Sequence, residues 1–281
     1  KELPEEITPL HHRHIMFGHA FKDQPDGQKL LERFQAGGGT LYDLEYLTDD
    51  TGRRVAAFGY WAGYAGAAVA IKSWAAAQKG NICQPLQTFA SAKDLNADVA
   101  SDLGKKNPSV IIIGANGRVG SGAQDFCAAL GASVTCWDIE ETAHGGPFPE
   151  ILDHDIFLNC ILANKNTPVF VPKKAKIGPR KLMVIGDIAC DPGSFYSPIK
   201  VYDCATSWEK PALRVHKDKI LDITAIDNLP SLLPRESSED FAAQLLPHLM
   251  MLQEIEKGVW GKACAIFNEY ISRTNAAKSQ S

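Results

Sequence analysis

The sequence predicts an α/β fold of two lobes, in which the central part of the chain forms one lobe inserted into the other. Two observations lead to this prediction. The apolar run at 109–113 enters a glycine-rich turn and then an amphipathic segment, which is the order of a strand, a tight turn and a helix. From Ser237 onward the pattern is that of two returning helices, the first capped by Ser237 or Ser238. Together they predict two Rossmann-like lobes with a cleft.

Composition and charge narrow the class of protein. The chain has 281 residues, of which 45% are hydrophobic and 22% charged, and its net charge is −4. This composition is typical of a soluble globular protein, and it offers no basic face for nucleic acid or an anionic membrane. The most apolar stretch, 58–71, is shorter than the ~20 residues of a membrane span. We therefore expect a small-molecule partner, no nucleic acid and no membrane.

The remaining elements follow from residue type and turn signals. Residues 40–47 and 54–58 carry β-type side chains around a turn, and residues 59–78 predict a helix. Further apolar runs predict strands at 133–137, 155–161 and 182–185. This order predicts a substrate lobe of residues 1–58 and 228–281 and an inserted nucleotide-binding lobe of residues 59–227.

The glycine-rich turn carries the main functional signal. Gly114, Gly117 and Gly120 have the spacing GxxGxxG, which departs from the more frequent GxGxxG. Glycines let the backbone approach a pyrophosphate, and the helix that follows supplies oriented N–H groups. Asp138 ends the next predicted strand, where a carboxylate accepts hydrogen bonds from ribose hydroxyls and repels a 2′-phosphate. The context predicts NAD rather than NADP, and a tight structural turn is the alternative.

Other motifs are less specific. Four histidines fall within 11–19, but no Cys or carboxylate stands at ligand spacing, so we predict packed or solvated histidines and no metal. The GSG at 120–122 lacks the GxSxG pattern of a nucleophile elbow, which argues against a hydrolase. Hydride transfer remains, and it needs acid–base groups and a cation for substrate carboxylates. Arg53 and Arg54 are candidates for that cation, with a solvated turn as the alternative.

Six segments carry a resemblance to a known family. They are KELP at 1–4, FGHAFKDQ at 17–24, TLYDLE at 40–45, GRRVAAFG at 52–59, IGANGR at 113–118 and DNLPSLLPRE at 227–236. In this order, and over nearly the whole chain, they resemble fungal saccharopine dehydrogenase of the NAD-dependent, lysine-forming type. Alanine dehydrogenase and the NAD-binding subunit of transhydrogenase share the two-lobed fold but lack GRRVAAFG and DNLPSLLPRE.

The resemblance implies a reaction, the last step of the α-aminoadipate pathway of lysine biosynthesis. Saccharopine, NAD and water give L-lysine, 2-oxoglutarate and NADH. The family assigns Lys1 as the base for the secondary amine and His19 as the acid–base group for imine hydrolysis. Lys1 must be neutral to act, so its pKa must lie below the ~10.4 usual for lysine.

The resemblance also implies the residues that bind substrate and cofactor. A bidentate guanidinium such as that of Arg54 suits a substrate carboxylate. The implied substrate contacts are Gln24, Arg54, Phe58, Ala189, Cys190 and Asp191. The implied NAD contacts are Arg53, Gly117, Arg118, Asp138, Thr142, Ile188, Ile226, Asp227, Asn228 and Leu229. For Thr142 and Ile188, simple packing is the alternative.

Two departures from the family affect these expectations. Family members carry a segment before the KE(M/L)P motif, including an Arg that binds a substrate carboxylate, so the first lobe is expected to be incomplete at its N-terminus. The chain ends in SQS rather than in a peroxisomal tripeptide, and its seven cysteines include no CxxC pair. We expect a monomer in the cytoplasm, with the peroxisome as the alternative. A related alanine- or opine-type dehydrogenase and a non-catalytic NAD-binding fragment are the alternative functions.

Overall fold

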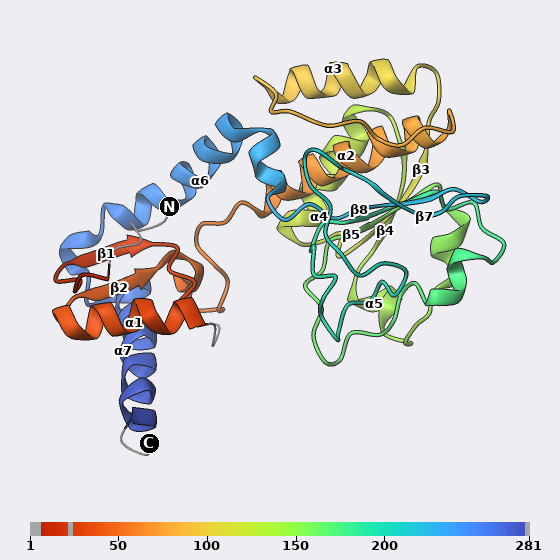
Figure 1. Cartoon of the computed structure of the whole chain (residues 1–281). Coiled ribbons are helices and arrows are strands. Elements are labelled where there is room, and N and C mark those ends of the chain that lie inside the picture. Colours follow the sequence, from red (N-terminus) through yellow and green to blue (C-terminus); the bar gives the residue numbers. More distant parts are fainter. Residues whose placement is uncertain (1–6, 22–24, 279–281) are drawn as a thin grey trace. The chain divides into compact units, whose positions relative to one another are not determined.

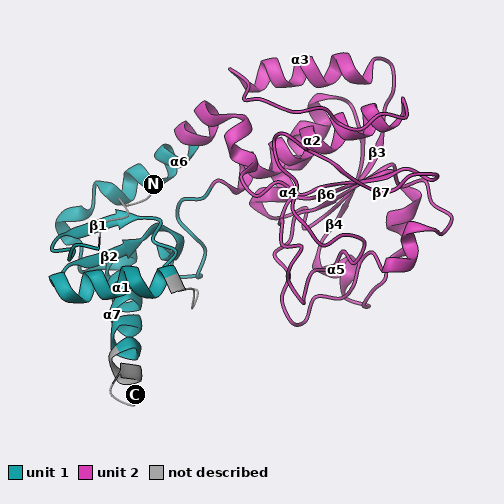
Figure 2. Ribbon diagram, in the orientation of Figure 1, with its two compact units in different colours: residues 1–57, 240–281 teal, residues 58–239 magenta. Residues whose placement is uncertain are grey.

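The computed structural model describes residues 7–21 and 25–278 and divides the chain into two compact units. Unit 1 contains residues 1–57 and 240–281, and unit 2 contains residues 58–239 (Figure 2). The α/β fold expected from the sequence is confirmed. None of the helices in the described ranges has the length and apolar content needed to cross a membrane.

Unit 1 is built around two short parallel strands. A parallel pair needs a helical crossover, and α1 supplies it between β1 and β2. The aromatic rings of Phe34 on α1 and Phe267 on α7 meet edge to face at 5.6 Å in the apolar core. The elements are β1 (Arg13–Met16), α1 (Pro25–Gly37), β2 (Thr40–Asp43) and α7 (Gly258–Lys278). Helix α6 spans Pro234–Leu249.

Unit 2 holds a six-stranded sheet of order β4-β3-β5-β6-β8-β7, parallel except for the antiparallel edge strand β7. Figure 1 shows where this sheet lies within the chain. Its strands are β3 (Ser109–Ile113), β4 (Ser133–Trp137), β5 (Ile156–Asn159), β6 (Val184–Asp187), β7 (Leu213–His216) and β8 (Leu221–Thr224). Its helices are α2 (Gly59–Ala77), α3 (Ala92–Leu103), α4 (Arg118–Ala129) and the short α5 (Ile139–Thr142). The chain leaves β3 toward β4 on one side and continues to β5 on the other side, so the strand order reverses at β3.

The two faces of this sheet are covered differently. Successive side chains of a strand point to opposite faces, so Val110 and Ile112 pack with α2, α3 and α4 in one core. Ile111 and Ile113 pack on the other face with residues of loops and 3₁₀ turns, among them Phe148 and Phe170. Burial on both faces explains why β3 and β5 are nearly continuous apolar runs in the sequence, whereas the edge strand β4 is only partly buried.

Several expected elements differ in the structure. Residues 54–58 do not form a strand, because the segment makes only the isolated bridge of Arg54 with Thr48 before α2 begins. The strand expected over 40–47 ends at Asp43, whose carboxylate caps a 3₁₀ turn at 44–46. Helix α6 begins at Pro234, so the expected cap at Ser237 or Ser238 is wrong. The Ser237 hydroxyl donates to Pro230 O instead.

Glycines allow α2 and α4 to pack with their backbones in contact. A Cβ atom at Gly63 would lie 1.8 Å from Val119 O, and one at Gly122 would lie 1.9 Å from Tyr60 O. Both positions are helical, where glycine costs about 1 kcal/mol relative to alanine. The close approach therefore opposes the intrinsic helix preference, and it seats α4 directly against α2.

Replacing Gly122 with alanine should lower the stability of unit 2. The new Cβ has no space, and overpacking of this kind costs about 1–3 kcal/mol. Thermal unfolding followed by circular dichroism measures the effect. Gly59→Ala is the matched control in α2, because its Cβ would meet side chains at an ordinary 3.4 Å. An unchanged unfolding temperature for Gly122→Ala would show that the two helices can move apart without cost.

Candidate cofactor site

The turn after β3 has a backbone that only glycine fits. Gly114 has φ +88°, and a Cβ there would lie 2.5 Å from Ile161 Cγ2. A Cβ at Gly120, on the first turn of α4, would lie 2.2 Å from Gly114 O. The glycines of the predicted motif thus hold the start of α4 against the end of β3.

The N-terminus of α4 is open toward the carboxyl edge of the sheet. Gly117 is the N-cap residue, and no described side chain caps the helix there. The first N–H groups of a helix lack partners within the helix and carry a partial positive charge, so this end suits a phosphate group.

Asp138 lies beside this turn. Its Oδ2 accepts a hydrogen bond of 2.8 Å from the backbone N–H of Asn116, and its Oδ1 accepts one of 2.9 Å from Ile139 N. Thr142 anchors the same segment, because its hydroxyl donates to Asp138 O at 2.8 Å. The backbone N–H of Glu141 also donates to this carboxylate and closes a capping box on α5. Two oxygens with two lone pairs each accept up to four hydrogen bonds, so one acceptor site stays for a ribose hydroxyl. No Lys or Arg occurs between 139 and 164 to receive a phosphate.

The neighbouring strands β5 and β6 end on a buried polar group. Asn159 and Asp187 are paired in register as the last residues of these strands. Asn159 Nδ2 donates to Asp187 Oδ1 at 2.9 Å, and the Tyr202 hydroxyl donates to Asp187 Oδ2 at 2.5 Å. Asp187 is only 2% exposed. Burial raises the pKa of Asp187 and outweighs these two hydrogen bonds, which lower it.

The loop after β6 is held by hydrogen bonds to Asp187 and to Ala225, the residue that follows β8. Cys190 has the left-handed φ of +48°, which is uncommon for a residue other than glycine. Its N–H donates to Asp187 O at 3.2 Å, and its thiol donates to Ala225 O at 3.1 Å. Burial raises the pKa of the Cys190 thiol to about 12, so the thiol stays neutral and acts as a donor.

The structure brings most of the expected cofactor residues to the carboxyl edge of one sheet. Ile188, Ile226 and Leu229 are buried in the core beneath α2, whereas Asp227 and Asn228 are exposed. The expected cofactor residues lie in the segments that follow β3, β4, β6 and β8. They are Gly117, Arg118, Asp138, Thr142, Ile188 and the stretch from Ile226 to Leu229. Their contacts with a cofactor stay predictions.

The sequence reasoning missed two apolar side chains at the same edge. Ile139 follows β4 and is 78% exposed, and Leu162 comes shortly after β5 and is 77% exposed. Large apolar side chains this exposed, on either side of the strand that carries the glycine-rich turn, suit the faces of a flat ring. A signal was present, since each follows a predicted strand end in a parallel sheet.

Unit 1 carries the expected acid–base residue His19. His19 Nδ1 lies 3.4 Å from Glu45 Oε2, its ring stacks on Phe17, and its side chain is 51% exposed. Its backbone has φ +50°, so the loop holds it in the left-handed region. Asp43, buried at the end of β2, accepts a hydrogen bond of 2.9 Å from Glu45 N and so fixes the Glu45 backbone.

The remaining expected site residues of the substrate lobe either have exposed or half-buried positions or lie outside the described residues. Arg53 and Arg54 are exposed next to a turn in which Asp49 Oδ1 accepts from the N–H groups of Thr51 and Arg53. Phe58 directly precedes α2 and is half-buried. Lys1 and Gln24 lie outside the described residues.

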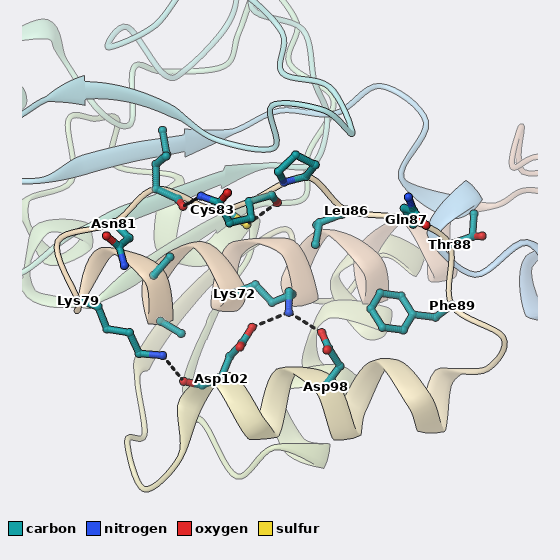
Figure 3. A pocket seen from close by; sticks show the side chains of 15 residues that line it. Lys72, Lys79, Asn81, Cys83, Leu86, Gln87, Thr88, Phe89, Asp98 and Asp102 are labelled. Carbon is teal, nitrogen blue, oxygen red and sulfur yellow. Dashed lines mark hydrogen bonds and ion pairs between the residues drawn. The ribbon is translucent and has the colours of Figure 1, made fainter.

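A cavity of about 710 Å³ lies elsewhere in unit 2, between the second half of α2, α3 and the loop 81–89 (Figure 3). Lys72 points from α2 toward Asp98 and Asp102 of α3 and pairs with both. Burial lowers the pKa of Lys72, but its hydrogen bonds to the two carboxylates outweigh burial and raise it overall. These three charges pair with one another, so they hold α3 on α2.

Metal ligands and disulfides are not found in the described part of the chain. No group of three or more His, Cys, Asp or Glu side chains there is placed to hold a metal ion. All seven cysteines are free.

The fold and the glycine-rich turn define a Rossmann-type α/β protein of the dehydrogenase class. The structure is similar to an L-alanine dehydrogenase, with a TM-score of 0.61 at 19% identity over 91% of this chain and 70% of that one, which shows a shared fold. No family model matches the chain. Its sequence is 43% identical to saccharopine dehydrogenase (NAD(+), L-lysine-forming) of Yarrowia lipolytica and 44% identical to that of Candida glabrata, in each case over 97% of this chain and 78% of the relative. The chain belongs to this family of saccharopine dehydrogenases.

The buried Asp187 should leave a signature in the pH dependence of stability. Because its pKa is raised in the folded state above the ordinary 3.8, its contribution to stability is fully present below that value and is lost as the pH rises through the folded pKa. The unfolding temperature of Asp187→Asn minus that of the unmodified protein should therefore increase from about pH 4 to pH 7. Calorimetry across this range measures it, and a difference that is constant or falls with pH would contradict the raised pKa.

Proposed function

We propose that this chain is an NAD-dependent oxidoreductase that converts saccharopine, NAD and water to L-lysine, 2-oxoglutarate and NADH. The observation that carries the cofactor assignment is the hydrogen bond from Asn116 N to Asp138 Oδ2, which sets an acceptor for a ribose hydroxyl beside a helix N-terminus that no described side chain caps. The identity to lysine-forming saccharopine dehydrogenases supports the substrate. The alanine dehydrogenase resemblance supports only the fold.

The residues of unit 2 fit a dinucleotide. The pyrophosphate would bind the N–H groups at the start of α4, and the adenosine ribose would bind Asp138. Ile139 and Leu162 would contact the adenine ring. When bound, NAD supplies the hydride acceptor for the carbon next to the secondary amine.

The acid–base work is assigned to side chains of this chain. Imine hydrolysis requires protons to be moved to and from the attacking water and the leaving amine, and His19 is proposed to move them. Glu45 faces His19 Nδ1, which orients the imidazole, and the Phe17 ring holds its plane. Lys1 is proposed as the base for the secondary amine and Arg54 as a partner for a substrate carboxylate. A monomeric state and a cytoplasmic location are part of the proposal.

A steady-state assay with saccharopine tests the proposed function and the role of Asp138 together. The unmodified chain should reduce NAD and not NADP. Asp138→Ala should weaken the binding of NAD by about 10- to 150-fold, because it removes a hydrogen bond to a charged group. The difference in affinity between NAD and NADP should therefore become smaller. NADP turned over as well as NAD would contradict the assignment. Activity with pyruvate and ammonia but not with lysine and 2-oxoglutarate would select the alanine-type alternative, and NADH binding without any turnover would select the non-catalytic one.

Replacing His19 tests the acid–base assignment. His19→Gln should lower the turnover number by roughly 10²- to 10⁴-fold, the usual contribution of one acid–base group. NAD affinity, measured by calorimetric titration, should stay within about twofold. His12→Gln is the matched control, because His12 is exposed in the same histidine-rich segment. A His19 variant with unchanged turnover and pH profile would return this residue to a packing role.

A further inference from the structure

Among the residues that the structure describes, the buried carboxylate of Asp187 has no charged partner. Its hydrogen-bond donors, Asn159 and Tyr202, are neutral, and no ion pair of Asp187 is found among the described residues. The other acid that acts on it electrostatically, Asp191, has the same sign of charge. A charge buried without a counterion is costly, so this carboxylate would gain from a positively charged group bound nearby.

The fold places this carboxylate at the ends of the strands toward which one particular half of the cofactor would extend. The adenosine half is assigned to Asp138 after β4, and the pyrophosphate to the start of α4 after β3. A dinucleotide extends across the point where the strand order reverses, so the nicotinamide half must extend toward the carboxyl ends of β5 and β6. Asn159 and Asp187 end those two strands.

We infer that Asp187 determines which oxidation state of the cofactor this site prefers, by favouring the positively charged nicotinamide ring of NAD⁺ over the neutral ring of NADH. The inference rests on the proposed cofactor site. A fixed negative charge in a weakly polarisable interior attracts a nearby cation more strongly than it would in water. Asn159 and Tyr202 hold the carboxylate in place and keep it hydrogen bonded without cancelling its charge.

Asp187→Asn removes the charge and keeps the shape. The new amide can donate to the Tyr202 oxygen and accept from Asn159, so the buried group stays hydrogen bonded. Calorimetric titration with NAD⁺ and with NADH gives the two dissociation constants. The ratio Kd(NAD⁺)/Kd(NADH) should rise by about 5- to 30-fold, mainly because NAD⁺ binds more weakly.

Two further variants separate charge from structure. Asp155→Asn removes a buried carboxylate from the amino-terminal edge of the same sheet, where Asp155 accepts from Ser109 N. Tyr202→Phe removes a hydrogen bond that lowers the pKa of Asp187, so it favours the neutral acid while keeping the Asp187 side chain. Asp155→Asn should keep the ratio within about twofold of the unmodified protein, whereas Tyr202→Phe should raise the ratio at low pH and lose this effect as the pH rises and the Asp187 carboxylate is restored.

The change in the two dissociation constants distinguishes an effect of charge from a structural role. Equal weakening of both cofactors by Asp187→Asn would show a structural role alone and overturn the inference. A ratio raised equally at every pH in Tyr202→Phe would attribute the preference to geometry rather than charge, and this measurement remains informative if Asp187→Asn does not fold. Failure of the unmodified chain to bind either cofactor would instead overturn the proposed function.

Discussion

The contact between the glycine-rich turn and the first turn of α4 is the constraint on which the site depends. A methyl group at Gly120 would overlap Gly114 O, so only glycine lets the helix start directly over the end of β3. With α4 in this place, the N–H of Asn116 reaches Asp138, which directly follows β4, and the helix N-terminus opens at the carboxyl edge. The glycines of α2 and α4 extend the same principle along the helices, since backbone contact replaces side-chain packing at Gly63 and Gly122.

The two edges of the sheet in unit 2 have different chemistry. At the carboxyl edge, polar groups are exposed or buried with incomplete charge compensation, as at Asp138 and Asp187. At the other edge, charged groups pair with one another. Arg214 binds both oxygens of the buried Asp222, and Lys181 pairs with Asp155. The large cavity beside Lys72 has the same compensated character, so size alone does not mark the site. The site is marked instead by polar groups that stay available to a ligand.

The strand, the turn, α4 and Asp138 could be predicted because they are adjacent in sequence and each has a strong local signal. The group of Asn159, Asp187 and Tyr202 could not, because its members come from three separate segments that meet only when β5 and β6 pair in register. The pairing of His19 with Glu45 likewise depends on the loop conformation at His19.

Secondary structure predicted from local sequence preference was also wrong where tertiary contacts decide the conformation. The β-type residues at 54–58 find no partner strand among the described residues, and Ala56 is buried without a ladder. Helices α1 and α3 were not predicted from the sequence, because each has only a narrow apolar stripe among many polar residues. In α3 that stripe consists of Leu95, Val99 and Leu103, spaced four residues apart.

Hydrogen exchange of backbone amides, with and without saturating NADH, tests the central claim most directly. The account predicts slower exchange at 114–122, where the turn meets α4, and at 138–142 and 188–191, with no change in the loop 81–89 beside the cavity. Protection confined to 81–89, with the glycine-rich turn unaffected, would contradict it.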